Sequence, residues 1–101
     1  MKVRILMQVI MLTMFMATPS VATGLMTCDS GVQTGWKSKQ ELAAKMKKDG
    51  WTVRHIKVDG GCYEAYATSP EGQRVEAYFH PVTLENLLIA RRGEILFRKT
   101  N

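Results

Sequence analysis

The sequence has few of the residues from which reactive centres are built. It contains two cysteines and two histidines in 101 residues, and Cys28 and Cys62 do not have the C-x-x-C spacing of redox-active pairs. A metal site needs several ligands in close geometry, and His55 and His80 form no such motif. No serine lies in a recognisable nucleophile motif. We therefore expect no catalytic residue, no metal site and no cofactor.

The sequence also lacks a concentrated block of charge. Its formal net charge is +5, but basic and acidic residues are interleaved along the chain. A nucleic-acid-binding surface needs a basic stripe, so we expect no nucleic-acid partner. An acidic protein or an anionic lipid surface remains compatible with the mild positive charge.

Residues 1–22 resemble a secretory signal peptide. Two basic residues precede an apolar run over residues 5–17, and small residues at Ser20 and Ala22 form a cleavage site. We expect cleavage after Ala22, with Gly24 as an alternative. The mature protein would then be periplasmic or secreted, without stable membrane insertion.

Two other interpretations of the amino-terminal region stay open. The first is an uncleaved anchor, although a spanning helix wants about 20 mostly apolar residues and Pro19 interrupts the run. The second is a lipoprotein acylated at Cys28. Cleavage after Ala22 would leave about 79 residues, enough for one small domain, and would lower the formal charge from +5 to +3.

Cys28 and Cys62 are the only cysteines. In an oxidising compartment, an even number of cysteines in a small domain indicates a structural disulfide. The loop that it closes would hold about 35 residues, which corresponds to about 4 kcal/mol in the chain-entropy model.

The stretch 59–79 predicts a β-hairpin. Its arms, 62–68 and 73–79, alternate apolar and polar residues, and turn-forming residues precede each arm. One face is apolar and carries Tyr63, Ala65, Ala67, Val75, Ala77 and Phe79. The other face, which we expect to be open to solvent, carries Cys62, Glu64, Tyr66, Thr68, Arg74, Glu76 and Tyr78.

The segments around this hairpin predict one helix and further strands. Residues 38–49 read as a helix, because Ser38 and Glu41 have the spacing of a capping box and Gly50 follows the last turn. Residues 51–58 predict a first strand with a bulge or with two buried faces. Residues 84–91 favour a fourth strand over a short helix, and residues 94–98 form either an edge strand or a packed tail.

Together these elements predict an α+β fold, with one helix packed on a three- to four-stranded antiparallel β-meander. We expect three parts: a signal peptide (1–22), an extended segment tethered by the disulfide (23–36) and the folded domain (37–101).

The chain resembles small periplasmic PepSY-domain proteins. The matching pieces are the stretch 50–53 after a helix, the Gly-Cys-Tyr-Glu-Ala segment at 61–65, the Glu-Gly turn at 71–72, and residues 75–84. Cys28 also fits members that pair an early cysteine with the one in this segment. Many members have Thr-Gly where this chain has Thr83-Leu84.

The resemblance implies a non-catalytic module that engages or inhibits a cell-envelope protein, such as a peptidase. The alternative is a ligand- or redox-responsive accessory of an envelope electron-transfer or two-component system. An enzyme is the third and weakest hypothesis. The candidate partner-binding residues lie on the expected open face: Tyr66, Tyr78, Glu64, Glu76 and Arg74. An exposed edge strand is a second route to a partner, by strand addition.

Overall fold

A computed structural model describes residues 24–100 of the chain; the expected signal peptide lies outside the described residues. A 3₁₀ turn, η1 (Gln33–Gly35), leads into the helix α1 (Lys39–Lys48). Five strands follow: β1 (Thr52–Asp59), β2 (Cys62–Thr68), β3 (Arg74–Phe79), β4 (Asn86–Arg91) and β5 (Glu94–Arg98). They form one antiparallel sheet in the order β1-β2-β3-β4-β5. The predicted α+β fold is confirmed, with five strands rather than three or four.

The helix begins where the sequence predicts. The Ser38 hydroxyl accepts a hydrogen bond from the backbone N–H of Glu41 at 3.0 Å, and the Glu41 carboxylate accepts one from the Ser38 N–H at 3.0 Å. This reciprocal capping box satisfies two amide groups that the first helical turn would leave unpaired. Gly50 follows the helix with a φ of 98°, the left-handed conformation expected after a helix end.

Removing the helix cap should have a small and measurable cost. We expect Ser38→Ala to lower the free energy of unfolding by about 1 kcal/mol, because the Glu41 amide loses its acceptor. Urea denaturation followed by circular dichroism measures the loss. Gln40→Ala, at an exposed helical position, is the control. Equal midpoints for the two variants would show that the cap contributes nothing.

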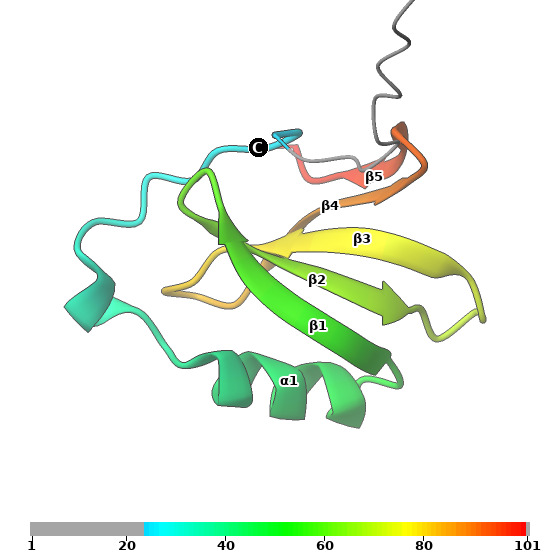
Figure 1. Cartoon of the computed structure of the whole chain (residues 1–101), viewed down its shortest axis with the longest axis horizontal. Helices are drawn as coiled ribbons and strands as arrows, with labels where there is room; N and C mark the ends of the chain where they lie inside the picture. The colour runs from blue at the N-terminus through cyan, green and yellow to red at the C-terminus, as the bar shows by residue number, and fades with distance from the viewer. Residues whose placement is uncertain (1–23, 101) are drawn as a thin grey trace, which may run out of the picture.

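The apolar face of the sheet packs against α1, which lies along one side of the sheet (Figure 1). The largest part of the core sits in this layer. Its buried members are Leu42, Met46, Ile56, Tyr63, Ala65, Ala67, Ala77, Phe79 and Leu84. Trp36 and Trp51 close its margins through edge-on ring contacts with Tyr63 and Phe79, at centroid distances of 5.6 and 6.3 Å.

A bulge in β1 explains how Val53 and Ile56, which strict alternation would place on opposite faces, come to lie on the same face of the sheet. The pairing with β2 shifts register between Val53 and His55. Because an inserted residue reverses the alternation beyond it, Val53 and Ile56 both pack in the layer under α1. Of the two sequence-based interpretations, the bulge is confirmed.

The fifth strand follows from a two-residue turn. Arg92 and Gly93 have φ angles of 53° and 83°, the pair of left-handed residues that a type I′ hairpin turn requires. The turn reverses the chain after β4, so that Glu94–Arg98 pairs with β4 as an edge strand. The strand interpretation of residues 84–91 is also confirmed from Asn86 onward.

Leu84 occupies the position where many PepSY proteins have glycine. Its φ is 63°, which a residue with a side chain adopts at a cost. Its backbone N–H donates to the His80 carbonyl oxygen at 2.7 Å, and its side chain is buried in the main core. Core packing therefore offsets the strain of the turn.

Candidate protein-binding face of the sheet

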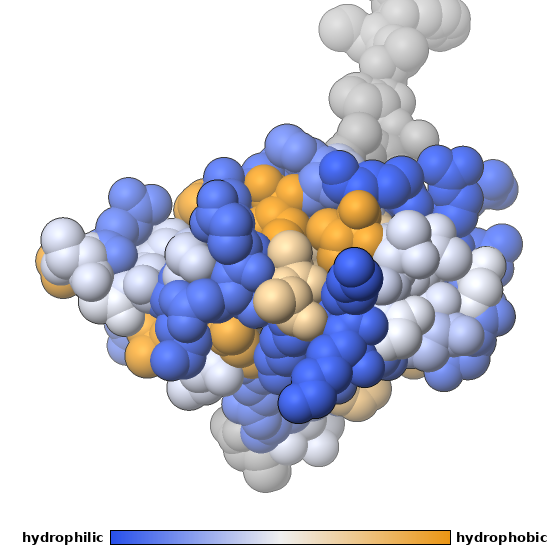
Figure 2. Space-filling model, turned by 90° about the horizontal axis from the view of Figure 1, so that it is seen from below, coloured by the Kyte–Doolittle hydropathy of each residue, from blue (hydrophilic) through white to orange (hydrophobic). Residues whose placement is uncertain are grey.

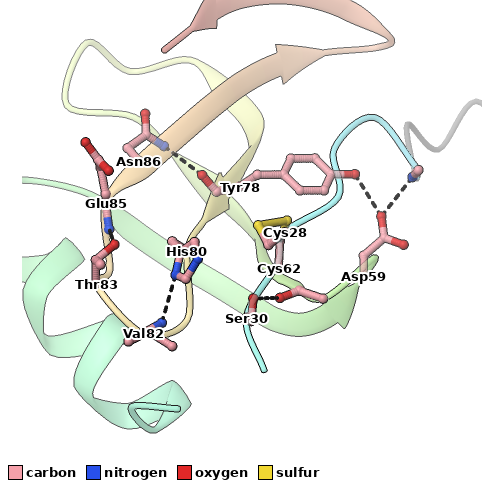
Figure 3. The surroundings of a disulfide bond; sticks show 12 residues. Cys28, Ser30, Asp59, Cys62, Tyr78, His80, Val82, Thr83, Glu85 and Asn86 are labelled. Atoms are coloured by element: carbon pink, nitrogen blue, oxygen red, sulfur yellow. Dashed lines mark hydrogen bonds between the residues drawn. A yellow bond between two sulfur atoms is a disulfide. The ribbon is translucent and has the colours of Figure 1, made fainter. Parts of the chain in front are cut away.

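The disulfide ties the N-terminal segment, defined as residues 24–30, to the sheet. Cys28 and Cys62 are bonded with an S–S distance of 2.06 Å, which confirms the predicted pairing. The Cys28 N–H donates to the Gly60 carbonyl oxygen at 2.8 Å. The Ser30 hydroxyl donates to the Gly61 carbonyl oxygen at 2.6 Å (Figure 3). The segment thus runs beside the turn between β1 and β2, on the side of the sheet away from α1 (Figure 1).

Two glycines allow this close approach. A Cβ atom at Gly60 would lie 2.6 Å from the Met26 carbonyl oxygen, and one at Gly61 would lie 2.5 Å from the Cys28 carbonyl oxygen. Both glycines have positive φ angles, 62° and 83°. The Gly60-Gly61 pair therefore forms the hairpin turn and also makes room for the N-terminal segment.

The covered part of this face is a second, smaller core. Its buried residues are Cys62, Tyr78, Leu88 and Ala90, with Leu25, Met26 and Cys28 packed against them. The Tyr78 ring lies beside the disulfide, and its hydroxyl donates to Asp59 Oδ2 at 2.9 Å (Figure 3). The Gly24 N–H donates to the same carboxylate oxygen at 2.8 Å. Asp59 thereby links the sheet to the start of the described chain.

The expectation that Glu64 and Tyr78 face solvent is wrong. Both side chains are 0% exposed. They are direct neighbours across β2 and β3, and the N-terminal segment packs on this end of the face. Alternation along the strand predicted their side of the sheet correctly, but it could not show what covers that side.

Glu64 is a buried carboxyl with weak compensation. Neither of its carboxyl oxygens has a hydrogen-bond partner, and the nearest cation, Lys57 Nζ, lies 3.7 Å from Oε1. Desolvation raises the pKa of Glu64 to about 7 against the attraction of Lys57, and the negative charges of Asp59 and Glu76 add to the rise. Burial likewise raises the pKa of Tyr78.

The other end of this face remains accessible. His55, Tyr66 and Glu76 are neighbours across β1, β2 and β3, and Arg74 lies at the start of β3. Arg74 and His55 are exposed, while Tyr66 and Glu76 are half-buried. We call these four residues the open patch. The sequence predicted three of them, and His55 was missed because the bulge in β1 determines its face.

The open patch combines an aromatic ring with charges of both signs. The Tyr66 ring lies 5.9 Å from the His55 ring and 5.6 Å from Lys57 Nζ, so it sits beside a cation on its own surface. Burial raises the pKa of Glu76, while the charge of Arg54 acts in the opposite direction. One Glu76 oxygen, Oε1, is buried without a hydrogen-bond partner. A partner could supply a donor to this carboxyl group.

A shallow cleft on the opposite side of the molecule escaped the sequence reasoning. It measures about 390 Å³ and is lined by Ala43 and Lys47 of α1 and by Trp51, Thr52 and Val53. Seen from the helix side, apolar surface interrupts the hydrophilic surface around α1 (Figure 2). The signal in the sequence was Trp51, three residues beyond the end of α1. The short connection to β1 leaves its large ring half-buried.

The two histidines lie in different surroundings. His55 stands in the open patch, and His80 Nδ1 accepts a hydrogen bond from the Val82 N–H at 3.1 Å after the end of β3 (Figure 3). Within residues 24–100, no three His, Cys, Asp or Glu side chains are placed to hold a metal ion. No helix in the same range is long and apolar enough to cross a bilayer.

The fold and its disulfide define a small α+β domain whose N-terminal segment is fastened across one face of its sheet. Residues 6–88 match the model of the family described as peptidase propeptide and YPEB domain, PepSY_2. The chain belongs to this family, as the resemblance indicated. Neither curated proteins nor solved structures yield a match. The family match ends before β5.

Proposed function

We propose that this protein is an exported, non-enzymatic PepSY module that binds a protein of the cell envelope, with a peptidase as the leading candidate. The observation that carries the proposal is the family match over residues 6–88, because the description of the family names a peptidase propeptide. A propeptide acts by binding the peptidase it accompanies. The amino-terminal sequence pattern supports export, and the disulfide fits an oxidising compartment.

The open patch is the surface through which we propose that binding occurs. Tyrosine and arginine are enriched at protein interfaces, because they combine a large contact area with hydrogen-bonding groups. Tyr66 and Arg74 supply these two residue types on adjacent strands. Glu64 and Tyr78 would contribute indirectly, by fixing the neighbouring part of the sheet under the N-terminal segment.

Truncating Tyr66 tests the proposed surface. We expect Tyr66→Ala to weaken binding to the partner about 10-fold or more, because truncating an aromatic hot-spot residue at an interface centre costs about 2 kcal/mol. The partner is first captured with a photo-reactive amino acid at position 66 in an envelope extract. Affinity is then measured by calorimetry with the purified protein.

The matched control for this experiment is Gln40→Ala, on the exposed surface of α1. It should leave affinity unchanged, and circular dichroism should show that both variants are folded at the temperature of the binding measurement. Equal affinities for wild type and Tyr66→Ala would place binding elsewhere. The proposed function would be contradicted if no discrete adduct formed with the photo-reactive residue on the open patch or with one on the helix side of the sheet.

An activity assay separates an inhibitor from a simple binding protein. If the captured partner is a peptidase, addition of the wild-type protein should lower its turnover of a peptide substrate, and Tyr66→Ala should require about 10-fold more protein for the same effect. If the protein binds the peptidase without changing its turnover of the substrate, it is a binding module and not an inhibitor.

A further inference from the structure

The free edge of β5 carries an unusual run of exposed apolar residues. Its three central side chains, Ile95, Leu96 and Phe97, are 40%, 43% and 43% exposed. β5 is the last strand of the sheet, so in residues 24–100 only one of its edges is hydrogen-bonded, to β4. An exposed apolar edge strand is a template for pairing with another strand.

The two edges of the sheet differ in how they are protected. β1, the opposite edge, carries Arg54, His55 and Lys57 in its central part, and charged residues on an edge strand discourage pairing. β5 has charges only at its two ends, Glu94 and Arg98. Of the two edges, β5 therefore carries fewer central charges and is the better candidate for strand addition.

The charges at the ends of β5 indicate which strand would pair with its free edge. The strand begins with Glu94 and ends with Arg98. When two copies pair in antiparallel fashion, the acidic end of each lies beside the basic end of the other, whereas parallel pairing would place like charges together. In the described range, neither Glu94 nor Arg98 forms an ion pair within its own chain. Both charges are available to a second copy.

A register shift between β4 and β5 leaves one apolar side chain, Leu96, available for contact with a second copy. The register between β4 and β5 shifts between Ile89 and Ala90, so Leu96 has no direct partner in β4. It remains exposed near the centre of the strand. In an antiparallel pair related by a two-fold axis, the central residues of the two strands meet near that axis, and Leu96 would lie there in both copies.

We propose that two copies of this protein associate by antiparallel pairing of their β5 strands, which joins two five-stranded sheets into one continuous sheet. The inference does not depend on the proposed partner protein: β5 lies outside the family match, and it is distinct from the open patch. Because a five-residue edge buries less area than a standard interface, the dimer is weak, with a dissociation constant between about 10 µM and about 1 mM.

A charge-swap cycle tests this pairing with the purified protein. Sedimentation velocity over a range of concentrations gives the dissociation constant. Glu94→Arg alone and Arg98→Glu alone each place like charges side by side twice in the dimer, so each should raise the dissociation constant at least about 10-fold. The double variant Glu94→Arg/Arg98→Glu restores opposite charges and should return to within about 3-fold of wild type.

Several outcomes would overturn the proposal. They are a wild-type protein that stays monomeric up to about 1 mM, single variants that dimerise as well as wild type, or a double variant that is no better than the singles. If a charge variant unfolds, Leu96→Thr replaces it, because Leu96 is exposed and outside the cores. If the wild-type protein is monomeric and Leu96→Thr reduces capture of the envelope partner, β5 binds that partner and not a second copy.

Discussion

Replacing both cysteines by alanine is expected to lower the free energy of unfolding by about 4 kcal/mol. The bond joins residues 34 positions apart, and the chain-entropy model gives this value for the loop that it closes. A domain of this size has only about 5 to 10 kcal/mol of total stability. The variant Cys28→Ala/Cys62→Ala should therefore retain only about 1 to 6 kcal/mol of stability.

Urea denaturation at 25 °C, with circular dichroism as the probe, measures this effect. Asp29→Ala is the matched control, since it changes an exposed residue of the same segment and leaves the bond intact. The double cysteine variant should also make Tyr78 more accessible to solvent, because the N-terminal segment loses its covalent tether. A loss below about 1 kcal/mol would mean that the hydrogen bonds of Gly60 and Gly61 hold the segment without the disulfide.

The second large effect is a pH dependence that originates at Glu64. Its pKa is about 7 in the folded protein, against a reference of 4.5. Between these values the unfolded chain releases the proton and the folded chain keeps it, so stability falls as the pH rises. The loss of stability caused by ionising the buried Glu64 carboxyl is absent below pH 4.5 and complete above pH 7. The difference between the two pKa values corresponds to about 3 kcal/mol.

Glu64→Gln should remove most of this decline. We expect the variant to be about 2 to 3 kcal/mol more stable than wild type at pH 8 and nearly equal to it at pH 4. Denaturation midpoints at a series of pH values give the comparison, and Glu71→Gln, in an exposed turn, is the control. Wild-type stability that rises from pH 5 to pH 8 would contradict the assignment. The raised pKa of Glu76 leaves a smaller residual dependence in the variant.

Local sequence signals predicted most of the architecture. The capping box of Ser38 and Glu41 predicted the helix start, and alternation predicted which face each residue of β2 and β3 occupies. The disulfide followed from the number of cysteines and the expected compartment. These features depend on residues close together in the chain or on a single possible pairing.

The choice of an edge strand over a packed tail for residues 94–98, and the burial of Glu64, required information that no local pattern contains. β5 exists because Arg92 adopts a left-handed conformation beside Gly93, which a sequence with one glycine at that point does not specify. Glu64 and Tyr78 are buried on a face that the N-terminal segment partly covers. The path of that segment depends on contacts more than 30 residues apart in the sequence.

The connectivity of the sheet has a consequence for how the chain folds. Each strand pairs only with the strands next to it in sequence, so the hairpins can form in succession from nearby residues, which favours rapid folding. The N-terminal segment is the exception, because its docking site is the turn between β1 and β2. During synthesis, the residues of this segment leave the ribosome before the strands do, yet they can be fixed in place only after that turn exists.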